Sequence, residues 1–335
     1  MTLGHAVVVA DETQLDEAGF AEARRGGIGA SDAGPVLGAD GSYRTNVDVW
    51  RDKVGDATPF EGNRFTEWGH RLEGVVAEAF SEIAGVEIQP AHWILAHPDL
   101  QHVRANPDRA VVEHGQVGVY EGKIADSRVG HRWAGGQDDG DFPDAYHAQV
   151  QHQLLVTGLD FGYLAVLIGG NDLRWRRIEA DLELHELMLE EYERFWWHVT
   201  HCTPPEPNGD PTGNKAALGA LYGRGGNPEW TVPIDDLADT LRALDAAKQA
   251  RKLTDDEIER LSNEVKARLG NATYGLVAGR KWAKWSRWTQ DELDRQAIAD
   301  EIGVTVDELK VRFSTSEPRS RLHIYKKEIR RGLPT

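Results

Sequence analysis

Cysteine is nearly absent from this chain of 335 residues, which has one, Cys202. A single cysteine excludes an internal disulfide framework, and it excludes a four-cysteine zinc site or an iron–sulfur cluster built from this chain alone. Long apolar runs are also lacking, since none approaches the roughly 18 to 20 residues that a membrane helix needs. The N-terminal apolar stretch has no basic flank before it and acids after it, unlike a signal peptide. We therefore expect a cytoplasmic protein with no membrane partner.

The chain also lacks an excess of positive charge. It has 38 Lys and Arg and 55 Asp and Glu, which give a net charge of −17. This balance argues against a nucleic-acid partner, because phosphate contacts need Lys and Arg. The acids gather in residues 1–205, which hold 16 Lys and Arg against 34 Asp and Glu, whereas residues 206–335 hold 22 against 21. A cluster of acids suits a divalent cation, and a nuclease needs only a locally basic groove. Net charge therefore does not decide the question.

No repeat of fixed period is present, but the composition changes at residues 203–230, where Pro, Gly and Asn concentrate. Such a stretch is typical of an exposed connection. We therefore predict a first domain over residues 1–203, a linker over 204–230 and an appendage over 231–335. Before the linker, helix and strand patterns alternate, which favours an α/β fold.

Hydrophobic periodicity predicts the elements of the first domain. Apolar residues from Phe65 to Ile83 recur at helical spacing and predict an amphipathic helix with a buried stripe, which Gly85 would end. Further strands are predicted at residues 92–96, 101–105, 116–125, 161–170 and 174–180, and further helices at 144–157 and 182–202.

The appendage has its own pattern. Leu and Ile at three-to-four spacing in two charged segments, residues 235–250 and 254–269, predict a helical hairpin. Residues 271–288, rich in Trp, Tyr and Val, predict a strand pair. Two further helices and a final strand over residues 321–328 would complete a small α+β unit.

The segment YEGK at residues 120–123 has a pattern used in metal-dependent chemistry. Alternate residues of a strand face the same side, so Glu121 and Lys123 project together. A hairpin over residues 108–123 would bring Asp108 beside Glu121, and two such carboxylates repel unless a cation such as Mg²⁺ lies between them. A neighbouring lysine can position or deprotonate water and stabilise charge on a phosphate. By itself, however, Glu-x-Lys occurs by chance on many surface strands.

Glu73 lies at the edge of the apolar stripe of the predicted 65–83 helix. A carboxylate there could reach the end of an adjacent sheet and serve as a further metal ligand. The alternative is a solvated surface glutamate.

Two other segments have features of a binding site. The glycine-rich segment RRGGIGASDAG, residues 24–34, resembles a phosphate-binding loop, in which Arg24 or Arg25 supplies charge and Ser31 or Asp32 caps the next helix. A plain turn with a helix cap explains it nearly as well. In the helix at residues 145–155, Tyr146, Gln149 and Gln153 share one face, which suggests a helix lying against a site or ordinary amphipathicity.

In order along the chain, five segments together resemble the YqaJ-type viral recombinase nucleases, relatives of the phage lambda exonuclease in the PD-(D/E)xK superfamily. These segments are IGASDAG, WGHRLEGVVAEAF, ANPDR, YEGK and AYHAQVQHQLLVTG, and the resemblance spans roughly residues 24–180. The resemblance implies a nuclease core with a mixed central sheet flanked by helices, and a phage or prophage origin.

Carried over residue by residue, the resemblance makes Asp108, Glu121 and the carbonyl of Gly122 metal ligands. It places Glu73 on the metal-facing helix, and Lys123 would act on the attacking water. The pocket for a terminal 5′-phosphate would be formed by Arg24, Ser31, Asn106 and Gln149.

The chain departs from the family pattern at several positions. The family usually has Ser at Asn106, Gly at Arg109 and a bulky apolar residue at Gly122, and a Pro commonly follows the lysine that Lys123 represents. These departures leave the acids intact but put the phosphate pocket in doubt at Asn106.

The activity implied by the resemblance is a metal-dependent 5′-to-3′ exonuclease on double-stranded DNA ends that releases 5′-mononucleotides. It would use one or two Mg²⁺ ions, with Mn²⁺ able to substitute, and leave 3′ single strands for an annealing protein in phage recombination. A homo-oligomer, such as a trimeric ring, is also implied. The alternatives are a structure-specific endonuclease of the same superfamily and a catalytically inactive DNA-binding or scaffold module.

In the appendage, GRKWAKWSRW at residues 279–288 interleaves basic and aromatic residues. This is what a surface that stacks single-stranded DNA needs, with Lys281, Lys284 and Arg287 as DNA contacts. Alternatively, the Trp side chains form the core of the small unit. The pair His198 and His201 with Cys202 lacks a fourth ligand at a recognised spacing, so we expect no zinc site there.

Overall fold

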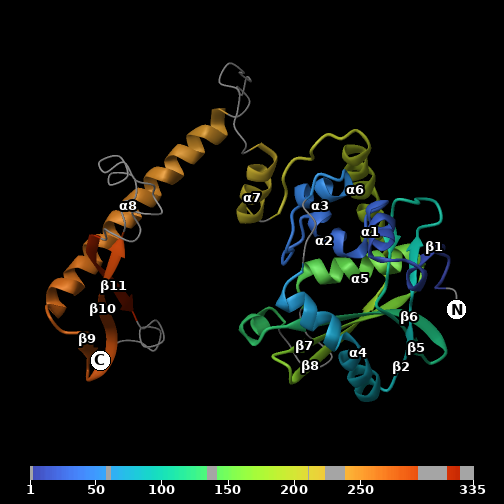
Figure 1. The fold of residues 1–335 in the computed structure, drawn as a ribbon, viewed down its shortest axis with the longest axis horizontal. Coiled ribbons are helices and arrows are strands. Elements are labelled where there is room, and N and C mark those ends of the chain that lie inside the picture. The colour runs from blue at the N-terminus through green and yellow to red at the C-terminus, as the bar shows by residue number, and fades with distance from the viewer. Residues whose placement is uncertain are drawn as a thin grey trace, which may run out of the picture. The chain divides into compact units, whose positions relative to one another are not determined.

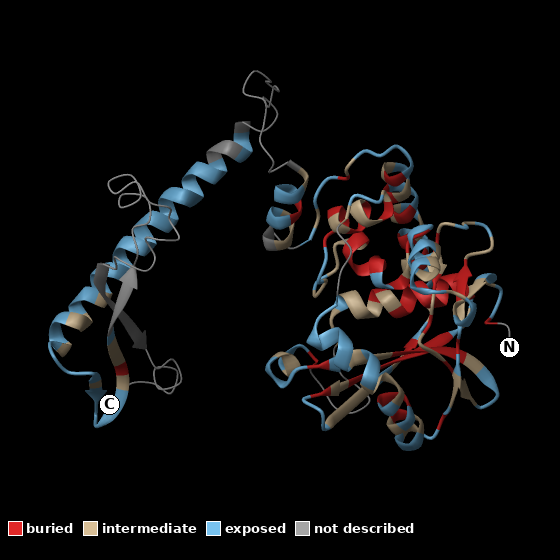
Figure 2. Cartoon of the chain, viewed as in Figure 1, coloured by how far each residue is buried: buried red, intermediate tan, exposed pale blue. Residues whose placement is uncertain are grey.

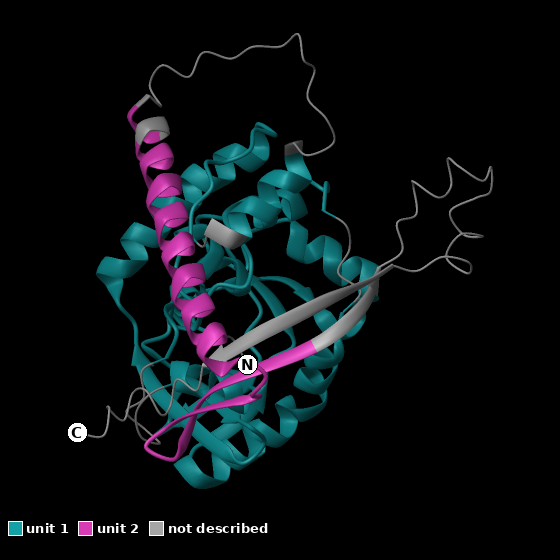
Figure 3. Ribbon diagram, turned by 90° about the vertical axis from the view of Figure 1, so that its left-hand side faces the viewer, with its two compact units in different colours: residues 1–229 teal, residues 230–335 magenta. Residues whose placement is uncertain are grey.

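The computed structural model describes residues 3–57, 62–133, 142–209, 211–222, 238–292 and 315–324. The chain divides into two compact units, residues 1–229 and 230–335 (Figure 3). Among the described helices, none is long and apolar enough to cross a membrane.

A five-stranded sheet forms the centre of the first unit (Figure 1). Its strands follow the order β2-β5-β6-β7-β8; β6 and β7 run parallel, and every other neighbouring pair is antiparallel. The predicted mixed α/β architecture is therefore confirmed. The strands are β2 (Glu87–Pro90), β5 (Arg109–Glu113), β6 (Gln116–Ala125), β7 (Phe161–Ile168) and β8 (Asp172–Glu179).

Helices α4 (Arg64–Ala84) and α5 (Asp144–Thr157) cover opposite faces of this sheet. Because strand side chains alternate in direction, Tyr163 and Ala165 of β7 pack with Phe80 of α4, whereas Leu164 packs with Leu154 of α5. Both faces of β7 are thus buried, which explains its continuous apolar sequence.

The prediction that α4 buries an apolar stripe along its whole length is wrong. Val76, Ala77 and Phe80 are buried, but Phe65, Trp68 and Val75 are each 57% exposed and Ile83 is 56% exposed. Periodicity locates an apolar stripe and cannot show whether the sheet is long enough to cover it.

A smaller layer joins the N-terminal segment to the chain before the central hairpin. Its sheet has the order β1-β3-β4, and the loop after α1 reaches it through a parallel bridge between Ile28 and Val103. The helices α2 and α3 pack with α5 and α6 in the main core. The elements are β1 (Val7–Asp11), α1 (Glu17–Arg25), α2 (Ala30–Leu37), α3 (Asn46–Lys53), β3 (Trp93–Ala96), β4 (Arg104–Ala105) and α6 (Leu182–Thr200), with 3-10 turns at Glu12–Gln14 and Ser127–Arg132.

The segment predicted as a linker contains a helix, α7 (Pro211–Tyr222), which contacts α3 and buries Ala217. Asn208 fixes the chain before this helix, because its side-chain amide donates to the carbonyl of Val36 at 2.9 Å. Proline and glycine therefore mark a change of direction here rather than a wholly irregular connection.

The helical hairpin predicted for the second unit is wrong. One continuous helix, α8 (Ala238–Leu269), replaces it. The joint between the two predicted helices holds the helix formers Arg251, Lys252 and Leu253, and the Thr254 hydroxyl donates back to the carbonyl of Ala250 at 3.0 Å instead of capping a new helix.

The predicted strand pair over residues 271–288 is present as β9 (Tyr274–Val277) and β10 (Arg280–Glu292), which pair antiparallel. The strand β11 (Thr315–Ile324) completes a sheet of order β11-β10-β9 and begins earlier than the predicted final strand. The two helices predicted before it fall largely on residues 293–314, outside the described residues.

Candidate active site

The hairpin of β5 and β6 brings Asp108 to Glu121. Its two-residue turn has His114 at φ 51° and Gly115 at φ 81°, the left-handed pair that suits the twist of a tight hairpin. The register places Arg109 opposite Tyr120, so Asp108, one residue before β5, lies at the level of Glu121. The Gly122 N–H donates to the Asp108 carboxylate at 2.9 Å. The predicted hairpin thus brings the two predicted acids together.

Glu121 points toward α5 and is 2% exposed. Its Oε1 accepts from Nε2 of Gln149 at 2.5 Å, its Oε2 accepts from Nε2 of Gln153 at 2.6 Å, and Lys123 forms an ion pair with it. Two amides one helical turn apart therefore hold one carboxylate, which gives a reason for the polar face predicted on this helix.

Burial and the neighbouring Glu121 raise the pKa of Asp108 to about 8. Burial lowers the pKa of Lys123, but the carboxylates of Glu121 and Asp108 outweigh it and raise the pKa above its ordinary value. The acids thus lie so close in a dry environment that one of them takes up a proton unless further positive charge is present.

This donor set fits a magnesium ion. Within the described ranges no three His, Cys, Asp or Glu side chains are grouped to hold a metal. Mg²⁺ is commonly held by one or two carboxylates while it keeps several waters, so Asp108 and Glu121 suffice, with the Gly122 carbonyl as a further oxygen.

Glu73 lies beside the two acids but pairs with another residue. Its Oε1 is 3.3 Å from Nη1 of Arg109, and that same nitrogen donates to the backbone carbonyl of Asp108 at 2.8 Å. Arg109, where the family usually has Gly, thus neutralises the predicted third acid of the site.

Gly122 also differs from the family pattern, and the structure shows what fills the space. A Cβ at Gly122 would lie 3.2 Å from the Tyr120 hydroxyl and 3.3 Å from its ring, on the face toward α4. The Tyr120 ring therefore occupies the room that a bulky residue at 122 would need.

A cavity of about 330 Å³ opens beside the acids. Arg24 at the end of α1 and Ser31 in the first turn of α2 face it, and Nη2 of Arg24 donates to the Ser31 hydroxyl at 3.0 Å. The structure thus places all four predicted phosphate-pocket residues around one space that also reaches Glu73 and Asp108. The residues that line this cavity include Arg24, Ser31, Glu73, Asn106, Asp108 and Gln149.

A buried ion pair supports the glycine-rich loop. Nζ of Lys53 lies 2.7 Å from the Asp32 carboxylate, both side chains are 3% exposed, and Nζ also donates to the Arg24 carbonyl at 3.2 Å. Burial would raise the pKa of Asp32, but the charges of Lys53 and Arg44 hold it at about 2. The helix α2 begins at Ala30 with Gly29 as its N-cap, so the prediction that Ser31 or Asp32 caps it is wrong. Asp32 lies in the first turn, and its carboxylate accepts from the Gly29 N–H at 3.0 Å.

Sequence reasoning missed several residues of this cavity. Arg104 lies against the loop after α1, where its guanidinium donates to the Ala23 carbonyl, and Glu12 accepts from the Asn106 amide at 3.1 Å. His70, one turn before Glu73 on α4, is the only one with a local signal, because it shares that residue's side of the helix. The other contacts join segments far apart in the chain, which periodicity does not reveal.

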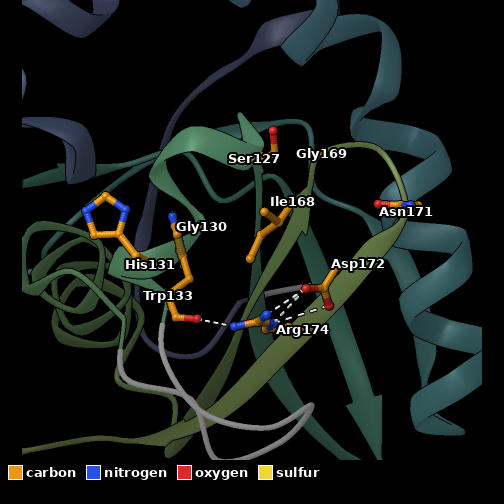
Figure 4. A pocket seen from close by; sticks show the side chains of 9 residues that line it. All are labelled: Ser127, Gly130, His131, Trp133, Ile168, Gly169, Asn171, Asp172 and Arg174. Carbon is orange, nitrogen blue, oxygen red and sulfur yellow. Dashed lines mark hydrogen bonds and ion pairs between the residues drawn. The ribbon is translucent and has the colours of Figure 1, made fainter. Parts of the chain in front are cut away.

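A second cavity, of about 520 Å³, lies at the ends of β6 and β7 (Figure 4). Its lining includes Arg174, whose guanidinium pairs with Asp172 at 2.6 Å and donates to the carbonyl of Trp133. The guanidinium that lines this space is therefore already engaged.

In the basic and aromatic segment of the second unit, residues 279–288, the tryptophans and the cations differ in exposure. Trp282 and Trp285 are half-buried, whereas Lys281 and Arg287 are exposed. Nζ of Lys281 lies 4.1 Å from the centre of the Tyr274 ring, and the Arg287 guanidinium lies 3.7 Å from that of Trp285. Part of each tryptophan thus contributes to the unit's packing while the cations remain on its surface.

Residues 19–160 match the YqaJ-like viral recombinase domain. The chain is also similar to the protein YqaJ of Bacillus subtilis strain 168, which is described as uncharacterized. It is 29% identical over 317 residues, which cover 92% of this chain and 96% of YqaJ. The two chains are homologous along nearly their whole length, the second unit included.

Solved structures give more distant likenesses. An alkaline exonuclease from Laribacter hongkongensis is 18% identical with a TM-score of 0.42, over 54% of this chain and 91% of that one. The structure of its complex with dAMP is 20% identical with a TM-score of 0.43, over 56% of this chain and 93% of that one. A phage related exonuclease from Haemophilus somnus 129PT is 12% identical with a TM-score of 0.40, over 53% of this chain and 96% of that one.

Proposed function

We propose that this chain is a Mg²⁺-dependent exonuclease that degrades one strand of double-stranded DNA from its 5′ end and leaves 3′ single strands. The observation that carries the proposal is the meeting of Asp108, Glu121 and Lys123 beside a cavity that Arg24 and Ser31 line. Buried acids with a neighbouring lysine match the needs of metal-assisted phosphodiester hydrolysis, and the cavity can admit a strand end.

A bound Mg²⁺, for which Mn²⁺ can substitute, would polarise the scissile phosphate and lower the pKa of a water ligand. Asp108 and Glu121 would hold one or two such ions, with Glu73 nearby. Gln149 and Gln153 fix the direction of the Glu121 carboxylate, so this group needs little rearrangement when it binds a cation. Lys123, whose raised pKa keeps it protonated near neutral pH, would orient the attacking water and stabilise charge on the phosphate.

The terminal 5′-phosphate would bind near Arg24 and Ser31. A guanidinium bound to a hydroxyl at the start of a helix offers charge and hydrogen-bond donors to an anion. Gln149 and Asn106 would complete the pocket, although the Asn106 amide now donates to Glu12 and to the Trp93 carbonyl.

The assignment as an exonuclease, its polarity and its biological setting rest on the resemblance to the viral recombinase nucleases. We expect 5′-mononucleotide products and an annealing protein that takes up the 3′ strands during phage recombination in the host cytoplasm. We also expect a homo-oligomer, such as a ring of three. The domain over residues 1–203 would carry the chemistry, while Lys281, Lys284 and Arg287 of the appendage would contact DNA.

A gel assay with linear duplex DNA labelled at one 3′ end, with and without Mg²⁺, tests the proposal. The expected result is metal-dependent loss of the strand opposite the label, faster with 5′-phosphate than with 5′-hydroxyl ends. Cleavage of closed circular DNA would favour the endonuclease alternative. No cleavage with any divalent cation would favour the binding module.

A further inference from the structure

The helix α8 is the longest helix in the described part of the chain, and most of it is uncovered (Figure 2). Every residue from 243 to 261 is exposed. Toward its end, Leu269 lies against Gly275 of β9, so the small sheet covers only that last part. A solvent-exposed helix of this length either relies on its own ion pairs or awaits a partner.

Apolar residues form a stripe on the exposed part of α8. Leu244 and Ile258 lie two heptads apart, as do Ala247 and Leu261, so these four residues share one side of the helix. Leu244, Ile258 and Leu261 are 48%, 56% and 47% exposed. Such a stripe can serve as the seam along which a second helix packs, because burial of its large apolar side chains is favourable.

Charge changes sign near the middle of this stripe. We call Lys248, Arg251 and Lys252 the basic block, and Asp255, Asp256, Glu257 and Glu259 the acidic block. Asp245 and Arg260 have the opposite sign to the block in their half, but both lie on the side of the helix away from the stripe. Because the acidic block follows the basic block, the charges of α8 are complementary to those of a second α8 that runs in the opposite direction. In an antiparallel pair each basic block faces an acidic block, whereas a parallel pair in register would set like charges together.

We propose that α8 pairs with α8 of a second copy of this chain, antiparallel, about a two-fold axis near residues 252 and 253. Leu244 then packs against Leu261 of the second copy, and Ala247 against Ile258 of the second copy. Lys248 lies beside Asp255 of the second copy, and the symmetry makes each contact twice. Arg251 and Thr254 form a polar centre in the seam, which favours one register over its neighbours.

The second copy is the partner that this charge order fits, because one sequence supplies both complementary halves in the required direction. The single helix does not need the partner in order to form. Ion pairs such as Arg251 with Asp255 at 3.4 Å and Arg260 with Glu257 at 2.7 Å support it alone. The interface is independent of the nuclease chemistry of the first unit, so its test does not depend on activity.

Charge exchange in the full-length chain tests the pairing. The reporter chain carries Cys202→Ser with Ala247→Cys and Ile258→Cys. Two antiparallel copies join position 247 to position 258, whereas two parallel copies join like positions, and mass spectrometry of the linked peptides distinguishes the two. An acidic version adds Lys248→Glu and Arg251→Glu, and a basic version adds Asp255→Lys and Glu257→Lys. Lys266→Glu, at the covered end of α8, is the matched control. Circular dichroism checks that every version keeps its helix.

Under mild oxidation the reporter and the Lys266→Glu control are expected to form disulfide-linked dimers. The acidic and basic versions alone should form roughly tenfold fewer, and an equal mixture of the two should recover the reporter's yield. The proposal is overturned if the reporter stays monomeric on the gel, as it would if another part of the chain covered the stripe. It is equally overturned if the acidic or basic version alone gives the same yield of linked dimer as the reporter, or if mixing the two versions does not raise that yield.

Discussion

The two units of this chain hold their charged residues in opposite ways. In the first unit, Glu121 and the pair of Asp32 and Lys53 are buried, and each has fixed partners. In the second unit, the charges of α8 lie on an exposed surface and are arranged as a basic block followed by an acidic block. A buried charge acts through one local geometry, so a single substitution should have a large effect. An exposed charge acts through a pattern, so several substitutions should be needed for a comparable effect.

The largest expected effect concerns the paired acids. Asp108→Asn and Glu121→Gln should each lower cleavage of linear duplex DNA with Mg²⁺ by roughly 10³-fold or more, because each removes a charged metal ligand. Glu87→Gln, at an exposed carboxylate on the neighbouring strand β2, is the control and should leave the rate unchanged. A wild-type rate in either variant would remove the basis of the site.

The buried ion pair should show the contrast between units in stability. Lys53→Met leaves the buried Asp32 with only Arg44, at 3.5 Å, as a charged partner and should lower the free energy of unfolding in urea by about 3–5 kcal/mol. Adding Asp32→Asn should recover part of this loss.

The same kind of change on α8 gives the comparison. Arg260→Met removes an exposed pair with Glu257, outside the proposed seam, and should change the free energy of unfolding far less than Lys53→Met does. Equal losses at Lys53 and Arg260 would contradict the distinction between the two units.

His152 should make the first unit sensitive to acid. Burial lowers its pKa to about 4, although the Arg104 carbonyl, at 2.7 Å from Nε2, opposes the shift. The unfolded chain protonates this ring near its ordinary value of 6.5, so stability should fall as pH drops from about 6.5 to about 4 and not change further below. The contribution is roughly 2–3 kcal/mol at pH 4.

Urea unfolding of His152→Gln between pH 7 and pH 4 checks this expectation. The variant should be less stable at pH 7 but lose less stability toward pH 4. His201→Gln, at an exposed histidine, should keep the slope of the wild type. The account of His152 fails if its substitution leaves that slope intact.

Two neighbouring arginines test the phosphate pocket. Arg24→Ala should reduce the preference for 5′-phosphate over 5′-hydroxyl ends by about tenfold, because it removes a charge-assisted donor to the terminal phosphate. Arg25→Ala changes the next residue, whose guanidinium pairs with Glu22 at 2.8 Å, and should leave the preference as it is. The measurement is the ratio of initial rates on the two substrates. Equal losses would assign the effect to net charge.

A small effect is expected from the DNA contacts of the second unit. Alanine at Lys281, Lys284 and Arg287 together should weaken duplex binding a few-fold and flatten its salt dependence, since each cation replaces counterions at a phosphate. Arg268→Ala, at an exposed position of α8, is the control. Affinity measured by fluorescence anisotropy at two salt concentrations separates the two outcomes, and an unchanged salt slope in the triple variant would remove this unit from the DNA contact.

The features that local sequence predicts are those set within one hairpin or one helix. The meeting of Asp108 with Glu121 follows from strand alternation and a two-residue turn, and residues 144–157 form the helix that was predicted. The interactions that local sequence does not predict join distant segments. Lys53 reaches Asp32 across a helix junction, and Arg109 reaches Glu73 from another layer. The single helix α8 shows the converse error. Thr254, the first residue of the second predicted helix, bonds back to Ala250 and lies within one continuous helix.

An anomalous difference map from crystals of the wild type soaked in Mn²⁺ would locate a bound metal ion directly. We expect a strong peak within ligand distance of the carboxylates of Asp108 and Glu121, and no such peak in crystals of Asp108→Asn. A map with no density between these two acids, or a peak that persists unchanged in the variant, would contradict the assignment of this hairpin as a metal site.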